Sequence, residues 1–101
     1  MPAAKPARPQ ALATVQFDNA RAVVTEWRFA PGAETGWHRH GHDYVVVPMT
    51  TGKLMLEELG GVERVVDLTA GKSYTRDEGV EHNVVNANRY EFVFLEIEMK
   101  K

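Results

Sequence analysis

A chain of 101 residues with a formal net charge of −2 has room for one domain with a single buried core. Its 14 acidic and 12 basic residues are interspersed, which excludes a basic surface for nucleic acid and a polybasic membrane-binding segment. The absence of cysteine excludes disulfides and thiolate metal sites. With no apolar run of signal-peptide or membrane-spanning length, the expected location is the cytoplasm.

The first segment of the chain, residues 1–13, is rich in proline and alanine. Pro2, Pro6 and Pro9 lack the amide hydrogen that a helix or a sheet interior needs. We therefore predict a flexible N-terminal arm over residues 1–13 and one folded domain over residues 14–101. The alternative is an arm that crosses onto a partner subunit.

From Thr14 onward, short runs of β-branched and aromatic residues alternate with turn signals such as Pro31-Gly32 and Gly60-Gly61. No helical periodicity of useful length is present. The pattern predicts an all-β sandwich or barrel. The expected strands cover residues 15–17, 22–29, 36–40, 44–49, 53–58, 63–68, 73–75, 82–85 and 90–99.

Several of these strands carry apolar residues on both faces. In the last one, the aromatic residues Phe92 and Phe94 alternate with Val93, Leu95 and Ile97. One face can fill the interior, whereas the other needs cover outside it. The simplest cover is a second copy of the chain, so we predict a homodimer.

Three of the four histidines, His38, His40 and His42, fall within five residues. Side chains two residues apart in a strand point the same way, with Cα atoms about 6.6 Å apart. His38 and His40 can therefore reach one ion, and imidazole binds several transition metals. In a straight strand His38 and His42 would lie about 13 Å apart, so we expect His42 at the rim. The alternative is a solvent-exposed strand face without a metal.

A second histidine segment, GKSYTRDEGVEHNVVN, covers residues 71–86, and the two segments together resemble the paired motifs of the cupin superfamily. The motif G-x5-H-x-H-x3,4-E-x6-G is matched at its fixed positions by Gly32, His38, His40 and Gly52. The motif G-x5-P-x-G-x2-H-x3-N is matched by Gly71, Gly79, His82 and Asn86. The segment HRHGHDYVVVPMTTG also resembles a group of small bacterial cupins linked by name to β-alanine degradation.

The resemblance implies a small cupin jelly roll, or double-stranded β-helix, with one divalent metal (Fe, Ni, Zn, Cu or Mn) held by His38, His40 and His82. Two positions depart from the motifs: Asp77 replaces the proline, and Tyr44, preceded by Asp43, stands where the glutamate is expected. A phenol with pKa near 10 is a poor ligand at neutral pH, so we expect water to complete the coordination. Whether Tyr44 or Asp43 takes the place of the glutamate stays open.

Three-histidine cupin centres recur among Fe(II) dioxygenases that act on small thiol acids or diketones. The resemblance therefore implies a metal-dependent enzyme for a small anionic substrate, with Tyr44 and His42 in the substrate pocket. Glu34, Glu78 and Glu81 border the motifs and could serve as acid or base, although solvated loop carboxylates are the commoner case. The alternative is a non-catalytic small-molecule binding or sensor barrel that retains the metal site, because the fold alone does not select a function.

Overall fold

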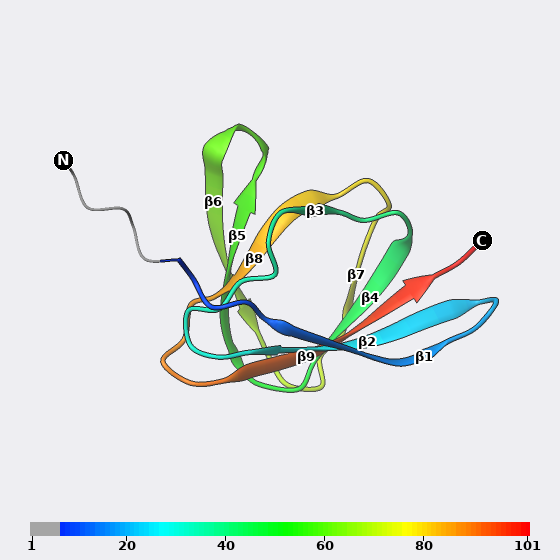
Figure 1. Cartoon of the computed structure of the whole chain (residues 1–101), viewed down its shortest axis with the longest axis horizontal. Helices are drawn as coiled ribbons and strands as arrows, with labels where there is room; N and C mark the ends of the chain where they lie inside the picture. The colour runs from blue at the N-terminus through cyan, green and yellow to red at the C-terminus, as the bar shows by residue number, and fades with distance from the viewer. Residues whose placement is uncertain (1–6) are drawn as a thin grey trace.

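The computed structural model describes residues 7–101, which form two antiparallel sheets packed face to face (Figure 1). A 3-10 turn, Leu59–Gly61, is the helical element of this range. The nine strands of residues 7–101 are β1 (Leu12–Asp18), β2 (Ala22–Phe29), β3 (His38–Arg39), β4 (Asp43–Pro48), β5 (Gly52–Glu58), β6 (Val62–Leu68), β7 (Tyr74–Arg76), β8 (Glu81–Asn86) and β9 (Phe92–Met99).

The larger sheet has the strand order β1-β2-β9-β4-β7 and the smaller one β3-β8-β5-β6. Figure 1 shows β1, β2 and β9 running together along one side, with the β5–β6 hairpin rising away from them. Strands β6 and β7 are therefore edge strands of different sheets. The all-β architecture expected from the sequence is confirmed, and residues 7–101 include no helix with the length and apolarity of a membrane crossing.

Strand β9 shows how the alternation of side chains builds the core. Phe92 and Phe94 are buried, whereas Val93 and Leu95 on the opposite face are half-exposed. Phe92 and Phe94 join Phe29 of β2 and Leu54 of β5 in one core, with the ring centroids of Phe29 and Phe94 5.4 Å apart. Burying each such side chain stabilises the fold by roughly 1.5–3 kcal/mol.

Two of the fixed motif positions have structural rather than chemical roles. The Asn86 side chain donates hydrogen bonds to the carbonyl oxygens of Phe29, Ala30 and Tyr90, which ties β8 to the ends of two neighbouring segments. A Cβ on Gly52 would lie 2.6 Å from the Tyr90 hydroxyl, so no larger residue fits there without displacement. Both residues hold the end of the barrel opposite the histidines.

The N-terminal segment joins the sheet before Thr14. Residues 1–6 of the arm expected over residues 1–13 lie outside the described residues. Strand β1 begins at Leu12, and the buried Ala11 donates its amide hydrogen to the carbonyl oxygen of Glu34 at 2.8 Å. Every residue of β1 is exposed, because this strand forms the outer edge of the larger sheet and pairs with β2 alone.

Candidate metal centre

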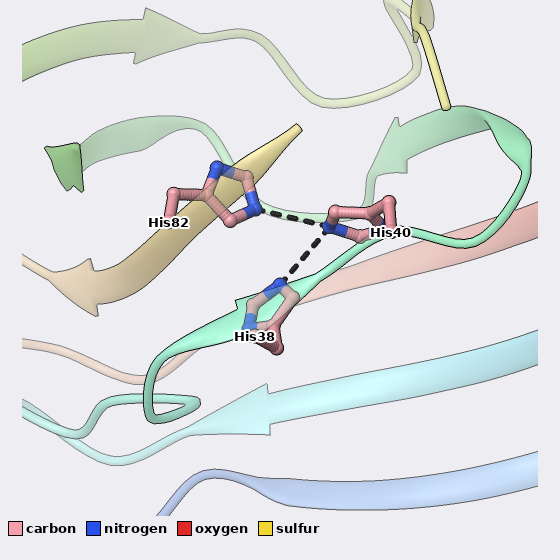
Figure 2. A group of neighbouring side chains, drawn as sticks. All are labelled: His38, His40 and His82. Carbon is pink, nitrogen blue, oxygen red and sulfur yellow. Dashed lines mark hydrogen bonds between the residues drawn. The ribbon is translucent and has the colours of Figure 1, made fainter. Parts of the chain in front are cut away.

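Three histidines from two neighbouring strands meet inside the barrel (Figure 2). His38 lies in β3 and His82 lies directly opposite it in β8. His40 follows β3, where its amide nitrogen and carbonyl oxygen bond to Val80 and Gly79. The Nε2 atom of His40 lies 3.0 Å from Nε2 of His38 and 3.0 Å from Nε2 of His82. The sequence therefore brings one nitrogen of each ring to a common point.

The tautomer of His38 follows from its contact with the backbone. Its Nδ1 lies 2.8 Å from the carbonyl oxygen of Gly36, and a carbonyl oxygen can only accept. Nδ1 therefore carries the hydrogen, and in the neutral ring Nε2 keeps a free lone pair. This is the tautomer that a metal ligand requires, fixed by a hydrogen bond on the far side of the ring.

The side chain of Asn83 holds the Gly36 peptide in place. Its Oδ1 accepts the Gly36 amide hydrogen at 2.9 Å, and its Nδ2 donates to carboxylate oxygens of Glu34 at 2.8 Å and Glu57 at 2.7 Å. Arg8 binds the same two carboxylates, at 3.1 Å and 2.8 Å. A continuous chain of polar contacts thus runs from the N-terminal segment to the peptide that orients His38.

The electrostatics of the site keep two of the rings neutral. Burial, with smaller contributions from His38 and Arg76, lowers the pKa of His40 to about 4. Burial and the same neighbours, together with His40, lower the pKa of His82 to about 3. Protons therefore compete weakly for these nitrogens at neutral pH, and a metal can bind without first displacing them.

Tyr44 occupies the place of the missing glutamate. Its ring is 2% exposed and stacks on His40, and its hydroxyl group has no hydrogen-bond partner among residues 7–101. Burial raises the pKa of Tyr44 well above its usual value. The hydroxyl therefore stays protonated and is a buried donor available to a ligand. The Nδ1 atom of His82 is likewise buried and lacks a partner in this part of the chain.

The acidic residues near the motifs are occupied in other ways. The carboxylate of Asp43 is exposed and accepts the Glu78 amide hydrogen at 2.7 Å, so it faces away from the histidines. Glu34 binds Arg8 and Asn83, and Glu78 forms an ion pair with Lys101 at 3.4 Å.

Glu81 and His42 also lie apart from the three converging nitrogens. Glu81 borders a surface hollow and is half-buried in β8. His42 is half-exposed on the bend before β4, outside the group of three histidines.

Two interior residues were missed by the sequence reasoning. Arg76 lines the small cavity of about 20 Å³ that also borders His82 and Tyr44. Glu96 is buried in β9, where desolvation and a hydrogen bond with Glu98 raise its pKa to about 8. The signal for Glu96 was available, because it continues the inward alternation of Phe92 and Phe94. The sequence holds no comparable signal for Arg76, because the position of Arg76 depends on which strand forms the edge of the sheet.

The three histidines fit a divalent transition metal. Metal–nitrogen bonds of about 2.0–2.1 Å at right angles place two ligand nitrogens about 3 Å apart, as the Nε2 atoms are here. Three imidazoles with no thiolate and no carboxylate are typical of Fe, Ni, Cu or Zn sites and atypical of Ca or Mg sites.

Comparisons with known proteins agree with this geometry. A family model for the cupin domain matches residues 25–98. The chain is 64% identical over 93 residues to the beta-alanine degradation protein BauB of Pseudomonas aeruginosa, covering 92% of this chain and 97% of that protein. A cupin domain from Bordetella pertussis Tohama I superposes with a TM-score of 0.93 at 63% identity, covering 96% of this chain and all of that one. A Klebsiella pneumoniae protein with a double-stranded β-helix domain matches in fold alone, with a TM-score of 0.74, 23% identity and coverage of 95% and 77%.

Proposed function

The chain belongs to the cupin family, and from that premise we propose that it binds one divalent transition metal through His38, His40 and His82 and acts on a small anionic ligand. The expected cupin jelly roll is confirmed by the family match and the superposition on the Bordetella domain. The observation that carries the proposal is the convergence of three Nε2 atoms, with the lone pair of His38 fixed toward the others.

The charge of the site favours an anionic ligand. Three neutral imidazoles leave the full charge of a divalent ion uncompensated, in a barrel interior where charges interact more strongly than in water. A bound metal would supply a Lewis-acidic centre that polarises a carboxylate or a diketone. The hydroxyl of Tyr44, which has no hydrogen-bond partner among residues 7–101, can donate to such a ligand. We place His42, on the bend before β4, at the rim of the substrate pocket.

The name of one relative supports the ligand class. The Pseudomonas protein is a beta-alanine degradation protein, and β-alanine is a short aliphatic carboxylate. A shared ligand class is consistent with 64% identity across nearly the whole length of both chains.

We favour a metal-dependent enzyme, with oxidation of a small carboxylate or diketone by oxygen as the first reaction to test. A non-catalytic binding or sensor barrel is the second candidate, because one observation supports it. Among the described residues that line the cavity beside His82, burial raises the pKa of Tyr44 and Tyr74 and lowers that of His82 to about 3, so none of these three groups exchanges protons readily near neutral pH.

The two candidates are separated by metal analysis of protein purified without chelator, followed by oxygen uptake with a panel of small carboxylates and diketones. About one metal per chain with ligand-dependent oxygen consumption supports the enzyme. About one metal with ligand binding and no turnover supports the binding barrel. Protein that stays below about 0.1 metal per chain after incubation with Fe²⁺, Ni²⁺, Zn²⁺, Cu²⁺ and Mn²⁺ contradicts both.

We also propose that the protein is a homodimer that pairs through the outer apolar face of the larger sheet. We define this face by its members: Phe17, Val24, Val45, Val47, Leu95 and Ile97. Phe17, Val24, Ile97 and Val45 are cross-strand neighbours in one row from β1 to β4, and Leu95 and Val47 pair in the next row. Val24 is buried beneath its neighbours, and the other five are partly or fully exposed. An apolar surface of this kind is typical of an interface, and a second copy can cover it symmetrically.

A further inference from the structure

A second cavity, of about 370 Å³, adjoins the small one beside His82. Both are lined by Leu56, Tyr74 and Arg76, so these three side chains separate the two cavities. The larger cavity is bounded by residues of β6 on one side and β7 on the other, which are the edge strands of the two sheets. Strand β6 pairs with β5 and strand β7 with β4, but β6 and β7 are not paired with each other, so the barrel is open along the seam between them.

The wall of this cavity is mainly apolar, with three charged residues. Two of these are already paired at its outer part. Arg64 binds Glu58 through Nε at 3.1 Å, and Asp67 accepts from Lys53 Nζ at 2.9 Å. Each such exposed pair uses the hydrogen-bonding capacity that a ligand would need.

Arg76, the third charged residue of this wall, differs from Arg64 and Asp67. It forms no ion pair with any of residues 7–101, although Glu58 and Glu81 line a further hollow that Arg76 also borders. Its side chain is half-buried, and within residues 7–101 it is the charged residue that lines both cavities. An unpaired guanidinium that is partly removed from water is costly unless an anion binds to it.

The register of β7 places Arg76 next to the metal centre. Arg76 lies directly opposite Tyr44 in the β4–β7 pair, and Tyr44 stacks on His40. The guanidinium thus stands between the three histidines and the opening at the seam.

We propose that Arg76 binds the carboxylate of a short aliphatic ligand that enters between β6 and β7, with its apolar body in the larger cavity and its carboxylate toward the small cavity beside His82. This inference rests on the proposed function and narrows its ligand class to carboxylates with a short apolar body. A guanidinium binds a carboxylate through two parallel hydrogen bonds, which orients the ligand as well as holding it. The apolar side chains Leu56, Val66 and Leu68 contact the body of the ligand.

The test is calorimetric titration of Ni²⁺-loaded protein with acetate, propanoate, malonate and succinate, and with propanamide as the uncharged match. The variants are Arg76→Gln, Arg76→Lys and, as a matched loss of one exposed positive charge elsewhere, Arg89→Gln. We expect the tightest carboxylate to bind Arg76→Gln about tenfold or more weakly, Arg76→Lys with an intermediate loss, and Arg89→Gln within about twofold. Propanamide should bind wild type and Arg76→Gln alike.

Equal carboxylate affinity in wild type and Arg76→Gln overturns the inference, and so does an absence of carboxylate binding to loaded wild type up to about 10 mM. Nickel content is measured for every sample, so failure of the metal site is recognised separately. If wild type holds no nickel, the proposed function fails, and the same titrations of the metal-free chain decide on Arg76. In the metal-free protein, weaker carboxylate binding by Arg76→Gln than by wild type supports the role of Arg76. Equal carboxylate affinity of the two proteins overturns the inference.

Discussion

The ring of Tyr44 lies parallel to the imidazole of His40, with ring centroids 3.8 Å apart and an angle of 15° between the planes. The stacking explains why an aromatic residue occupies the motif position where cupins carry glutamate. Tyr44 packs against the ring of His40, and its hydroxyl has no hydrogen-bond partner in the described part of the chain. Its raised pKa, caused chiefly by burial, makes it a donor rather than a ligand.

From this relationship we predict that Tyr44→Phe keeps the metal and weakens the binding of a small carboxylate by about 0.5–1.5 kcal/mol, the net value of one hydrogen bond. Tyr44→Glu should keep or tighten the metal and weaken carboxylate binding much more, because a protein carboxylate then cancels part of the charge of the site. Metal analysis and calorimetry measure both effects. Loss of metal from Tyr44→Phe would show that the phenol is a ligand. Undiminished anion binding by Tyr44→Glu would show that the uncompensated charge of the metal site does not drive anion binding.

Replacement of His82 by alanine should reduce metal content sharply, because two imidazoles remain on one short segment and the ligand from β8 is lost. The fold should survive, since the core beneath it is apolar. The matched control is His42→Ala, which should keep the metal because His42 lies outside the group of three. Metal content by mass spectrometry and circular dichroism give the comparison. Full occupancy in His82→Ala, or loss in His42→Ala, contradicts the ligand assignment.

Asn83 should tune metal affinity without touching the metal. In Asn83→Ala the Gly36 peptide loses its hydrogen-bond acceptor, so the carbonyl that fixes His38 becomes mobile. We expect metal affinity to fall by about tenfold, the low end for partners of metal-binding histidines. Asn88→Ala, which removes a comparable amide that binds Lys53, is the control and should leave metal affinity unchanged. Chelator competition measures both, and equal affinities in the two variants would show that Asn83 does not position His38.

The homodimer prediction is tested by light scattering at micromolar concentration, where wild type should have about twice the chain mass of 11.3 kDa. Leu95→Glu places a charge in the outer apolar face and should give a monomer. Val65→Glu, at a 57% exposed position on β6 outside that face, should remain a dimer. A monomeric wild type, or equal effects of the two variants, would exclude this face as the interface.

The sequence was most informative where one residue type repeats at a fixed spacing. His38 and His40 are two apart, and His82 follows the second motif's glycines, so the sequence predicts that these three histidines lie together, as they do in the structure. The inward and outward residues of β9 followed from strict alternation. Such local patterns carry their own geometry, because strand side chains alternate with a period of two.

Features that depend on which strands become neighbours were not predictable in this way. The strand expected over residues 36–40 is limited to His38–Arg39, because only that part pairs with β8. Leu12 and Ala13, expected in the arm, belong to β1 because they pair with β2. Arg76 gained its position from β7 being an edge strand, which no property of the TRDE segment reveals.

Because β3 is so short, a metal bound by the three histidines would also help to hold this strand in place. This strand has two residues, lies at the edge of its sheet and is held by the two register pairs His38↔His82 and Arg39↔Glu81. Ligation would fasten it to β8 through the side chains as well. Unlike a disulfide, the ion leaves on unfolding, so it stabilises by binding the folded state. The three histidines would then hold β3 against β8 only while the ion is bound. The edge of the barrel would be held more tightly with metal than without it.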